Sequence, residues 1–146
     1  VPAASWDMFR LVSALRASGY TCPGGQRFEP NKEPLAFDCR MWRAALEHSQ
    51  EIATFGSFAP PSPPTNNQTG QHRVDGTDGD SEGWQAAVAV GLESPRQAIQ
   101  QIMWSTEHCT LLMDPKQRYF ADGFATIEDS KYRYYWTQLF RPGVGA

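Results

Sequence analysis

Residues 59–83 constrain the fold of this 146-residue chain more than any other segment. Four of these 25 residues are Pro and four are Gly, and Ala59 and Val74 are their only other apolar side chains. A segment of this composition has too little apolar area to pack as a helix or a strand. We therefore expect a long polar loop, which is a functional loop, an insertion or a mobile segment. The ordered elements are expected before and after it.

The chain before this loop predicts two helices, joined by an irregular segment over residues 22–34. The first helix is expected to begin at a Ser5 cap and to end at Gly19. Its apolar side chains recur on one face: Met8, Leu11, Val12 and Leu15. The second is expected to begin at an Asp38 cap and to end at Gly56. Its apolar face carries Met41, Ala45, His48, Ile52 and Phe55.

The chain after the loop predicts strands and two further helices. Trp84–Val90 alternates like a strand and is apolar on both faces, which favours a central strand. Ser94 followed by Pro95 indicates a helix start, and the helix is expected to reach about Trp104. A short helical turn is expected around residues 107–113. The β-rich runs 124–127 and 132–140 predict a hairpin.

This order of elements predicts a single α+β domain over residues 1–146, with helices packed on an antiparallel sheet. The net charge is −3 and no Lys/Arg cluster is present, which argues against a nucleic-acid or anionic-membrane surface. The longest apolar run, Ala86–Val90, is too short to cross a bilayer, so no transmembrane segment is expected. Small ligands or proteins are the expected partners.

The cysteines do not fix the redox compartment. Cys22, Cys39 and Cys109 permit one disulfide with a free thiol, or three thiols in a reducing cell. Val1–Ala4 lacks the features of a signal peptide, so the chain is either a processed secreted protein or a piece cut from a longer one. The sequon at Asn67 permits glycosylation if the chain is secreted.

Few residues suggest catalytic or metal chemistry. His48 lies on the apolar face of the second helix and is interpreted as a hydrogen-bonded core residue, and His72 lies in the polar loop. His108 is the best single candidate for a site residue. Setting Asp78 at position one of an EF-hand loop places Ala89 where a bidentate Glu is required, so a solvated acidic turn is the preferred interpretation. No zinc-ribbon pair, phosphate loop or nucleophile elbow is present.

Aromatic side chains are dense near the end of the chain. If residues 132–140 form one strand, Tyr132, Tyr134 and Trp136 share a face. Core packing is the preferred interpretation, and an aromatic binding platform is the alternative.

Six short segments, in their order and spacing, carry a resemblance that spans essentially the whole chain. They are PLAFD from Pro34, AALEHSQ from Ala44, GSF from Gly56, VGLESP from Val90, STEHC from Ser105 with LMDP from Leu112, and YWTQLF from Tyr135. Together they resemble the CAP superfamily of cysteine-rich secretory, antigen-five-like and pathogenesis-related proteins, in its short bacterial-type form. The resemblance implies a three-layer αβα sandwich with a central antiparallel sheet. It also implies a Cys22–Cys109 disulfide, which leaves Cys39 as a buried thiol or an intermolecular link.

The family often carries two His and two Glu in a central cleft, which in some members bind a divalent metal. Of these four positions only His108 clearly matches, because Pro60 and Ala86 fall where a His and a Glu are usual. The remaining Glu cannot be placed, although His72 and Glu82 are nearby possibilities. Zinc requires at least three protein ligands, so the resemblance implies a degenerate site and no cofactor.

The resemblance therefore favours a non-catalytic binding module, extracellular or on the cell surface, for a protein, a glycan, or a lipid or sterol. His108, His72 and Glu82 are its candidate ligand-binding residues. The alternative is a metal-dependent hydrolase-like site rebuilt from His108, His72 and the carboxylates of the loop.

Overall fold

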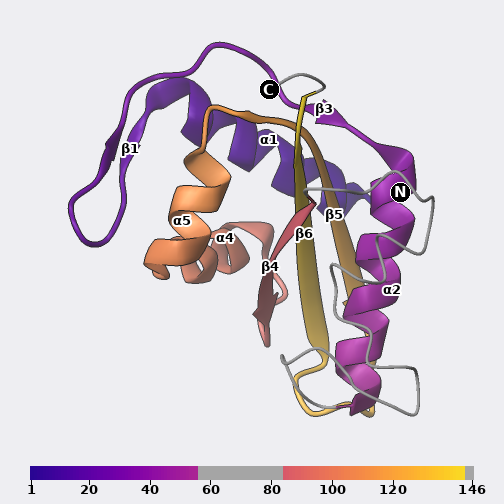
Figure 1. Cartoon of the computed structure of the whole chain (residues 1–146). Helices are drawn as coiled ribbons and strands as arrows, with labels where there is room; N and C mark the ends of the chain where they lie inside the picture. Colours follow the sequence, from indigo (N-terminus) through magenta and orange to yellow (C-terminus); the bar gives the residue numbers. More distant parts are fainter. Residues whose placement is uncertain (56–83, 144–146) are drawn as a thin grey trace.

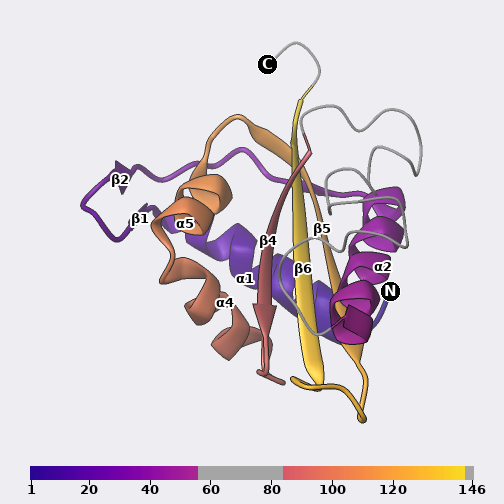
Figure 2. The ribbon, with the colours of Figure 1, turned by 60° about the horizontal axis from the view of Figure 1, so that its bottom comes forward.

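A computed structural model describes residues 1–55 and 84–143 and shows three layers (Figure 1). A four-stranded sheet forms the middle layer. Helix α2 covers one face, and α1, α4 and α5 cover the other, an arrangement that is also clear when the molecule is turned (Figure 2). The predicted α+β sandwich is confirmed. The long loop predicted over residues 59–83 lies outside the described residues.

The helices lie close to where the sequence predicts them. Their bounds are α1 Ala3–Ser18, α2 Cys39–Phe55, α4 Pro95–Met103 and α5 Thr106–Met113. Asp38 caps α2 through its Oδ1, which accepts from the Arg40 amide at 2.8 Å. Ser94 accepts from the Gln97 amide at the start of α4, as the sequence predicts. No described helix combines the length and the apolar character that a membrane crossing requires.

The prediction of Ser5 as a helix cap is wrong. The N-cap lies three residues earlier, at Pro2, which has an extended conformation, and helix α1 begins at Ala3. Ser5 lies inside the helix and is fully buried. Its side chain therefore faces the protein interior. Gly19 ends the helix with a φ of 81°, which glycine adopts without strain.

The described strands form two sheets. A two-stranded sheet joins β1 and β2, and the larger sheet has the order β3-β5-β6-β4. Strand bounds are β1 Tyr20–Thr21, β2 Arg27–Phe28, β3 Ala36–Phe37, β4 Gln85–Val90, β5 Gln117–Thr126 and β6 Tyr134–Pro142. The β4–β6 and β5–β6 pairs are antiparallel, as predicted, but the two-residue β3 runs parallel to β5. The sheet is therefore mixed at one end.

The prediction of Trp84–Val90 as a central strand is wrong in position. Among the described strands β4 pairs only with β6, so it lies at an edge of the sheet. It is apolar on both faces because both faces are covered. Ala87 and Ala89 pack in the core beneath α1 and α4, whereas Val88 and Val90 pack with Ile52 of α2. Coverage by two helical layers, and not a central position, explains the composition.

The hairpin of β5 and β6 is confirmed, but the predicted face of Tyr132 is wrong. Arg133 has a φ of 70°, a left-handed conformation that interrupts the strand. Tyr132 consequently packs with Tyr135 on the α2 side, whereas Tyr134 stacks on Phe124 on the opposite face. Trp136 is fully buried and contacts Phe124, in agreement with core packing.

Candidate functional site

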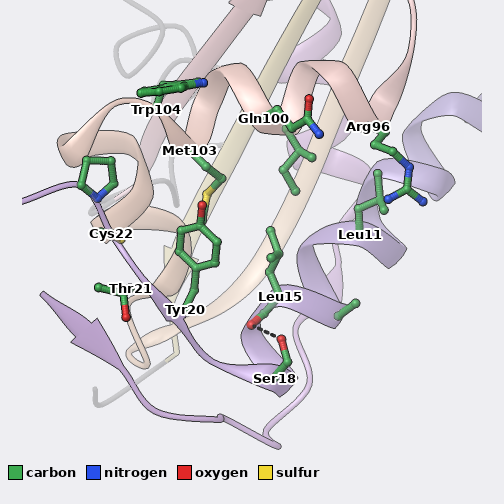
Figure 3. A pocket seen from close by; sticks show the side chains of 13 residues that line it. Leu11, Leu15, Ser18, Tyr20, Thr21, Cys22, Arg96, Gln100, Met103 and Trp104 are labelled. Carbon is green, nitrogen blue, oxygen red and sulfur yellow. Dashed lines mark hydrogen bonds between the residues drawn. The ribbon is translucent and has the colours of Figure 1, made fainter. Parts of the chain in front are cut away.

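A groove of about 800 Å³ separates α1 from α4 and ends at the segment that follows β1 (Figure 3). Helix α1 contributes Leu11, Ala14, Leu15 and Ser18, and α4 contributes Arg96, Ile99, Gln100 and Met103. The volume is within the range typical of pockets that bind small ligands.

Helical periodicity places apolar side chains along both walls. Leu11 and Leu15 are four residues apart on α1, and Ile99 and Met103 have the same spacing on α4. Residues four apart lie one above the other on a helix face. Ile99 and Met103 are nearly fully buried at the base, with 5% and 4% exposure. The inner surface of the groove is therefore apolar along its length.

The outer edge of α4 has a different character. Arg96, Gln100 and Trp104 also follow a spacing of four, and Figure 3 shows Arg96 and Trp104 at opposite ends of the groove. Trp104 is 81% exposed, which is unusual for so large an apolar side chain. No ion pair of Arg96 occurs within residues 1–55 and 84–143. A charged group at one end and an exposed indole at the other thus border the apolar wall.

The end of the groove near Trp104 is fixed covalently. Cys22, which lines the groove, forms a disulfide with Cys109 of α5, with the two Cα atoms 5.8 Å apart. This confirms the predicted pairing. The Thr106 hydroxyl also donates to the main-chain oxygen of Pro23 at 2.9 Å. The segment after β1 is therefore held against α5, and Cys39 is a free and exposed thiol, which excludes its alternative as a buried one.

Of the residues predicted to form a ligand site, only His108 lies among the described residues. His108 lies in the first turns of α5, is partly buried, and does not line the groove. Its main-chain amide donates to the Ser105 hydroxyl, which caps α5. His72, Glu82 and the Asn67 sequon lie outside the described residues, as does Pro60. Ala86 packs on the α2 side of the sheet.

His48 occupies a position typical of a core residue. It is 4% exposed on α2, and its Nδ1 lies 3.8 Å from Oε1 of Glu51, one helical turn away. Within the described ranges no three His, Cys, Asp or Glu side chains are arranged to hold a metal ion. The structure therefore offers an apolar groove as its candidate site, and neither His48 nor His108 lines it.

Sequence reasoning missed this groove. A signal was present, because Arg96, Gln100 and Trp104 share one face of a securely predicted helix, and an exposed Trp on the polar face is informative. What the sequence does not show is that α1 lies beside α4 at a distance that leaves their facing apolar rows open to solvent.

Comparisons with known proteins agree with this architecture. A sequence model of the family described as "CAP: Cysteine-rich secretory protein family" matches residues 11–140. A search among curated protein sequences finds no match.

Solved structures with a similar fold come from several organisms. An extracellular protein containing a SCP domain from Bacillus anthracis has 18% identity and a TM-score of 0.72, and the match covers 96% of this chain and 40% of that one. An outer surface protein from Borrelia burgdorferi has 13% identity and a TM-score of 0.70, with 94% and 92% covered. Venom allergen-like protein 4 from Schistosoma mansoni has 11% identity and a TM-score of 0.66, with 98% and 90% covered. At these identities the likeness establishes the fold alone.

Proposed function

The chain belongs to the cysteine-rich secretory protein (CAP) family, and from this premise we propose that it is an extracellular binding module whose groove between α1 and α4 takes the acyl chain of a lipid. The observation that carries the proposal is the apolar lining of the groove, in which Leu11 and Leu15 are partly exposed and Ile99 and Met103 form a nearly buried base.

The chemistry of the groove favours a lipid over a glycan or a peptide. Sugars and peptides present many polar groups, which need hydrogen-bonding partners when they are buried. The base of the groove offers Ile99 and Met103, whereas Gln100, Ser18 and Thr21 are exposed at its margin. The Tyr20 hydroxyl also points into the groove, toward Met103 (Figure 3), so the polar groups there are few. A flexible apolar chain has no hydrogen bonds to lose on such a surface, and its transfer out of water is favourable.

The margin of the groove suggests how the ligand is oriented. From Arg96 to Trp104 a helix rises roughly 12 Å, so the two residues mark the ends of an elongated site. Arg96 has an unpaired guanidinium in the described structure, and guanidinium groups bind carboxylates and phosphates. We expect an anionic head group near Arg96 and the far end of the chain near Trp104.

An extracellular location is supported by the disulfide, because stable disulfides are typical of oxidising compartments. Two of the similar structures carry the descriptions "extracellular protein" and "outer surface protein". This chain spans 40% of the length of the first of them, so that relative has further parts with no counterpart here.

A fatty-acid titration tests the proposal. We expect dodecanoate to bind the folded protein, with heat measured by calorimetry and with a blue shift of Trp104 fluorescence. Ala14→Trp fills the groove from an exposed position on α1 and should weaken binding at least tenfold. Ala17→Trp is the matched control, because Ala17 is exposed on the same helix outside the groove. Equal affinities for these two variants, or no binding by the parent protein, would refute the groove as a lipid site.

A further inference from the structure

A cluster of buried polar side chains lies between the first turn of α1 and the sheet, among apolar neighbours. It consists of Ser5 of α1, Asp122 of β5 and Gln138 of β6, and each of the three is fully buried. Asp122 and Gln138 are directly opposite each other in the β5–β6 register. Phe120, two residues before Asp122, packs on Phe9 of α1, so alternation along β5 points Asp122 to the same side.

The cluster contains more polar atoms than the structure pairs. The hydroxyl of Ser5, both carboxyl oxygens of Asp122 and both amide atoms of Gln138 are buried without a hydrogen bond of normal geometry. Buried polar groups in folded proteins are nearly always hydrogen-bonded, and a buried unpaired carboxylate is especially unfavourable. The site is therefore unfavourable for the ionised form of Asp122, unless a nearby cation pairs with it.

The surrounding residues that the structure describes supply no cation to an ionised Asp122. On α1, Asp7 and Arg10 pair with each other at the surface, and Arg16 lies at the far end, bound to main-chain oxygens. On α2, which covers the opposite face of the sheet, His48 lies beside Glu51. The facing residue of β6 is the neutral Gln138, and the residues of β3 are apolar.

Burial accordingly raises the pKa of Asp122 well above the usual carboxyl range, and the nearby Ser5 hydroxyl lowers that pKa only in part. A protonated carboxyl group also suits the chemistry of its neighbours. Its O–H can donate to the Gln138 carbonyl oxygen, while its C=O accepts from the Gln138 amide or the Ser5 hydroxyl. A small rotation of these side chains would satisfy the cluster.

We propose that Asp122 is a proton-dependent latch, which seats the first turn of α1 on the sheet as a neutral carboxylic acid and releases it on ionisation. The folded form then keeps one proton that the unfolded chain releases when the pH rises through the range in which exposed carboxyl groups ionise. Between that range and the raised pKa, the folded state holds more protons than the unfolded state. Stability supplied by the latch is complete at low pH and decreases as the pH rises.

The size of the effect follows from linkage of a single proton. Across this window the unfolding equilibrium constant of the parent protein should increase about tenfold per pH unit relative to Asp122→Asn. Other carboxylates and histidines contribute to the pH dependence of both proteins equally, so the difference between them isolates Asp122. Asp7→Asn removes an exposed carboxylate that pairs with Arg10 and serves as the matched control.

The experiment combines urea unfolding at several pH values with infrared spectroscopy. We expect the parent protein at neutral pH to show the carbonyl stretch of a protonated carboxylic acid, which Asp122→Asn lacks and Asp7→Asn retains. Hydrogen exchange in the first turn of α1 should accelerate with pH, beyond its intrinsic dependence, only where Asp122 is present. The proposal is overturned if the infrared band is absent, or if the parent and Asp122→Asn show parallel pH dependences. If Asp122→Asn fails to fold, the band and the exchange of the parent protein decide alone.

Discussion

Arg16 of α1 donates a hydrogen bond from Nη1 to the main-chain oxygen of Leu112, in the last turn of α5, at 2.9 Å. The same guanidinium donates to the main-chain oxygen of Asp114 at 2.8 Å and to that of Gln117 at 3.1 Å. Arg16 is only 2% exposed. It therefore satisfies carbonyl groups that the end of α5 leaves open, and it joins α1 to the turn that leads into β5.

Replacing Arg16 should be among the most damaging single substitutions in this fold. Arg16→Met keeps much of the side-chain volume but leaves three acceptors without their donor, and we expect a loss of at least about 3 kcal/mol in the free energy of unfolding. Arg16→Lys should recover only part of this lost stability, because an ammonium group donates hydrogen bonds but cannot reproduce the planar geometry of the guanidinium. Urea unfolding measures both. Arg10→Met, at an exposed ion pair, should change stability by less than about 1 kcal/mol, and a comparable loss there would contradict the role given to Arg16.

Gly123 marks the closest approach between α2 and the sheet. A Cβ atom at this position would lie 2.2 Å from the main-chain nitrogen of Leu46 and 2.3 Å from the main-chain carbon of Ala45. The Ser49 hydroxyl donates to the Gly123 oxygen at 2.6 Å, which holds the helix at this distance. Backbone atoms cannot move aside as the end of a flexible side chain can.

We therefore expect Gly123→Ala to destabilise the protein by several kcal/mol, because α2 and β5 must separate along their length. Thermal unfolding or urea titration measures the effect. Gly25→Ala distinguishes steric overlap from backbone strain, since a Cβ at Gly25 meets nothing within 4 Å although its φ is 101°. That variant should lose only about 1 kcal/mol. Similar losses for the two variants would show that the approach of α2 is looser than described.

The disulfide is expected to stabilise the protein by restricting the unfolded chain. Cys22 and Cys109 are 87 residues apart, and closing a loop of this length stabilises a protein by roughly 4 to 5 kcal/mol if the bond is unstrained. Replacing both cysteines with Ala should lower the free energy of unfolding by about this amount under non-reducing conditions. Cys39→Ser should have little effect, because Cys39 is exposed and free. Peptide mapping without reduction that found a Cys22–Cys39 link would contradict the pairing.

Much of the fold could be predicted because its signals are local. The start of α4 depends on Ser94 and Pro95, which act within a single turn. The apolar face of α2 follows helical spacing, and its cap at Asp38 is confirmed. The extent of β5 was underestimated. The polar residues Arg118 and Asp122 interrupt the apolar pattern in the first half of this strand. Asp122 is buried because α1, which is distant in sequence, covers it.

The candidate site was harder to predict because it depends on how separate elements lie together. Nothing near Gly123 in the sequence indicates that α2 contacts its backbone. The groove likewise requires α1 and α4 to present Leu15 and Met103 to one another. His108 is predicted from its sequence neighbours and also from the family pattern, and its role in ligand binding stays a prediction.

Titration with zinc tests whether His108 is a metal ligand. Zinc needs at least three protein ligands, and the described residues place no such set near His108. Pro60 and Ala86, at two positions of the family pattern, have no side-chain donor. We therefore expect calorimetry to detect no tight zinc binding, and His108→Ala to leave dodecanoate binding within about twofold of the parent.

The alternative of a rebuilt metal site predicts a different set of results. One equivalent of zinc would bind at micromolar affinity or better, and both His108→Ala and His72→Ala would abolish it, since each removes an essential ligand. Gln100→Ala is a suitable control, because Gln100 lies at the margin of the groove and is not a metal ligand. Zinc bound by the parent and by Gln100→Ala, but by neither histidine variant, would identify His108 as a metal ligand and return the protein to the candidates for metal-dependent catalysis. If dodecanoate binding persisted in all three variants, the groove and the metal site would be independent features of one domain.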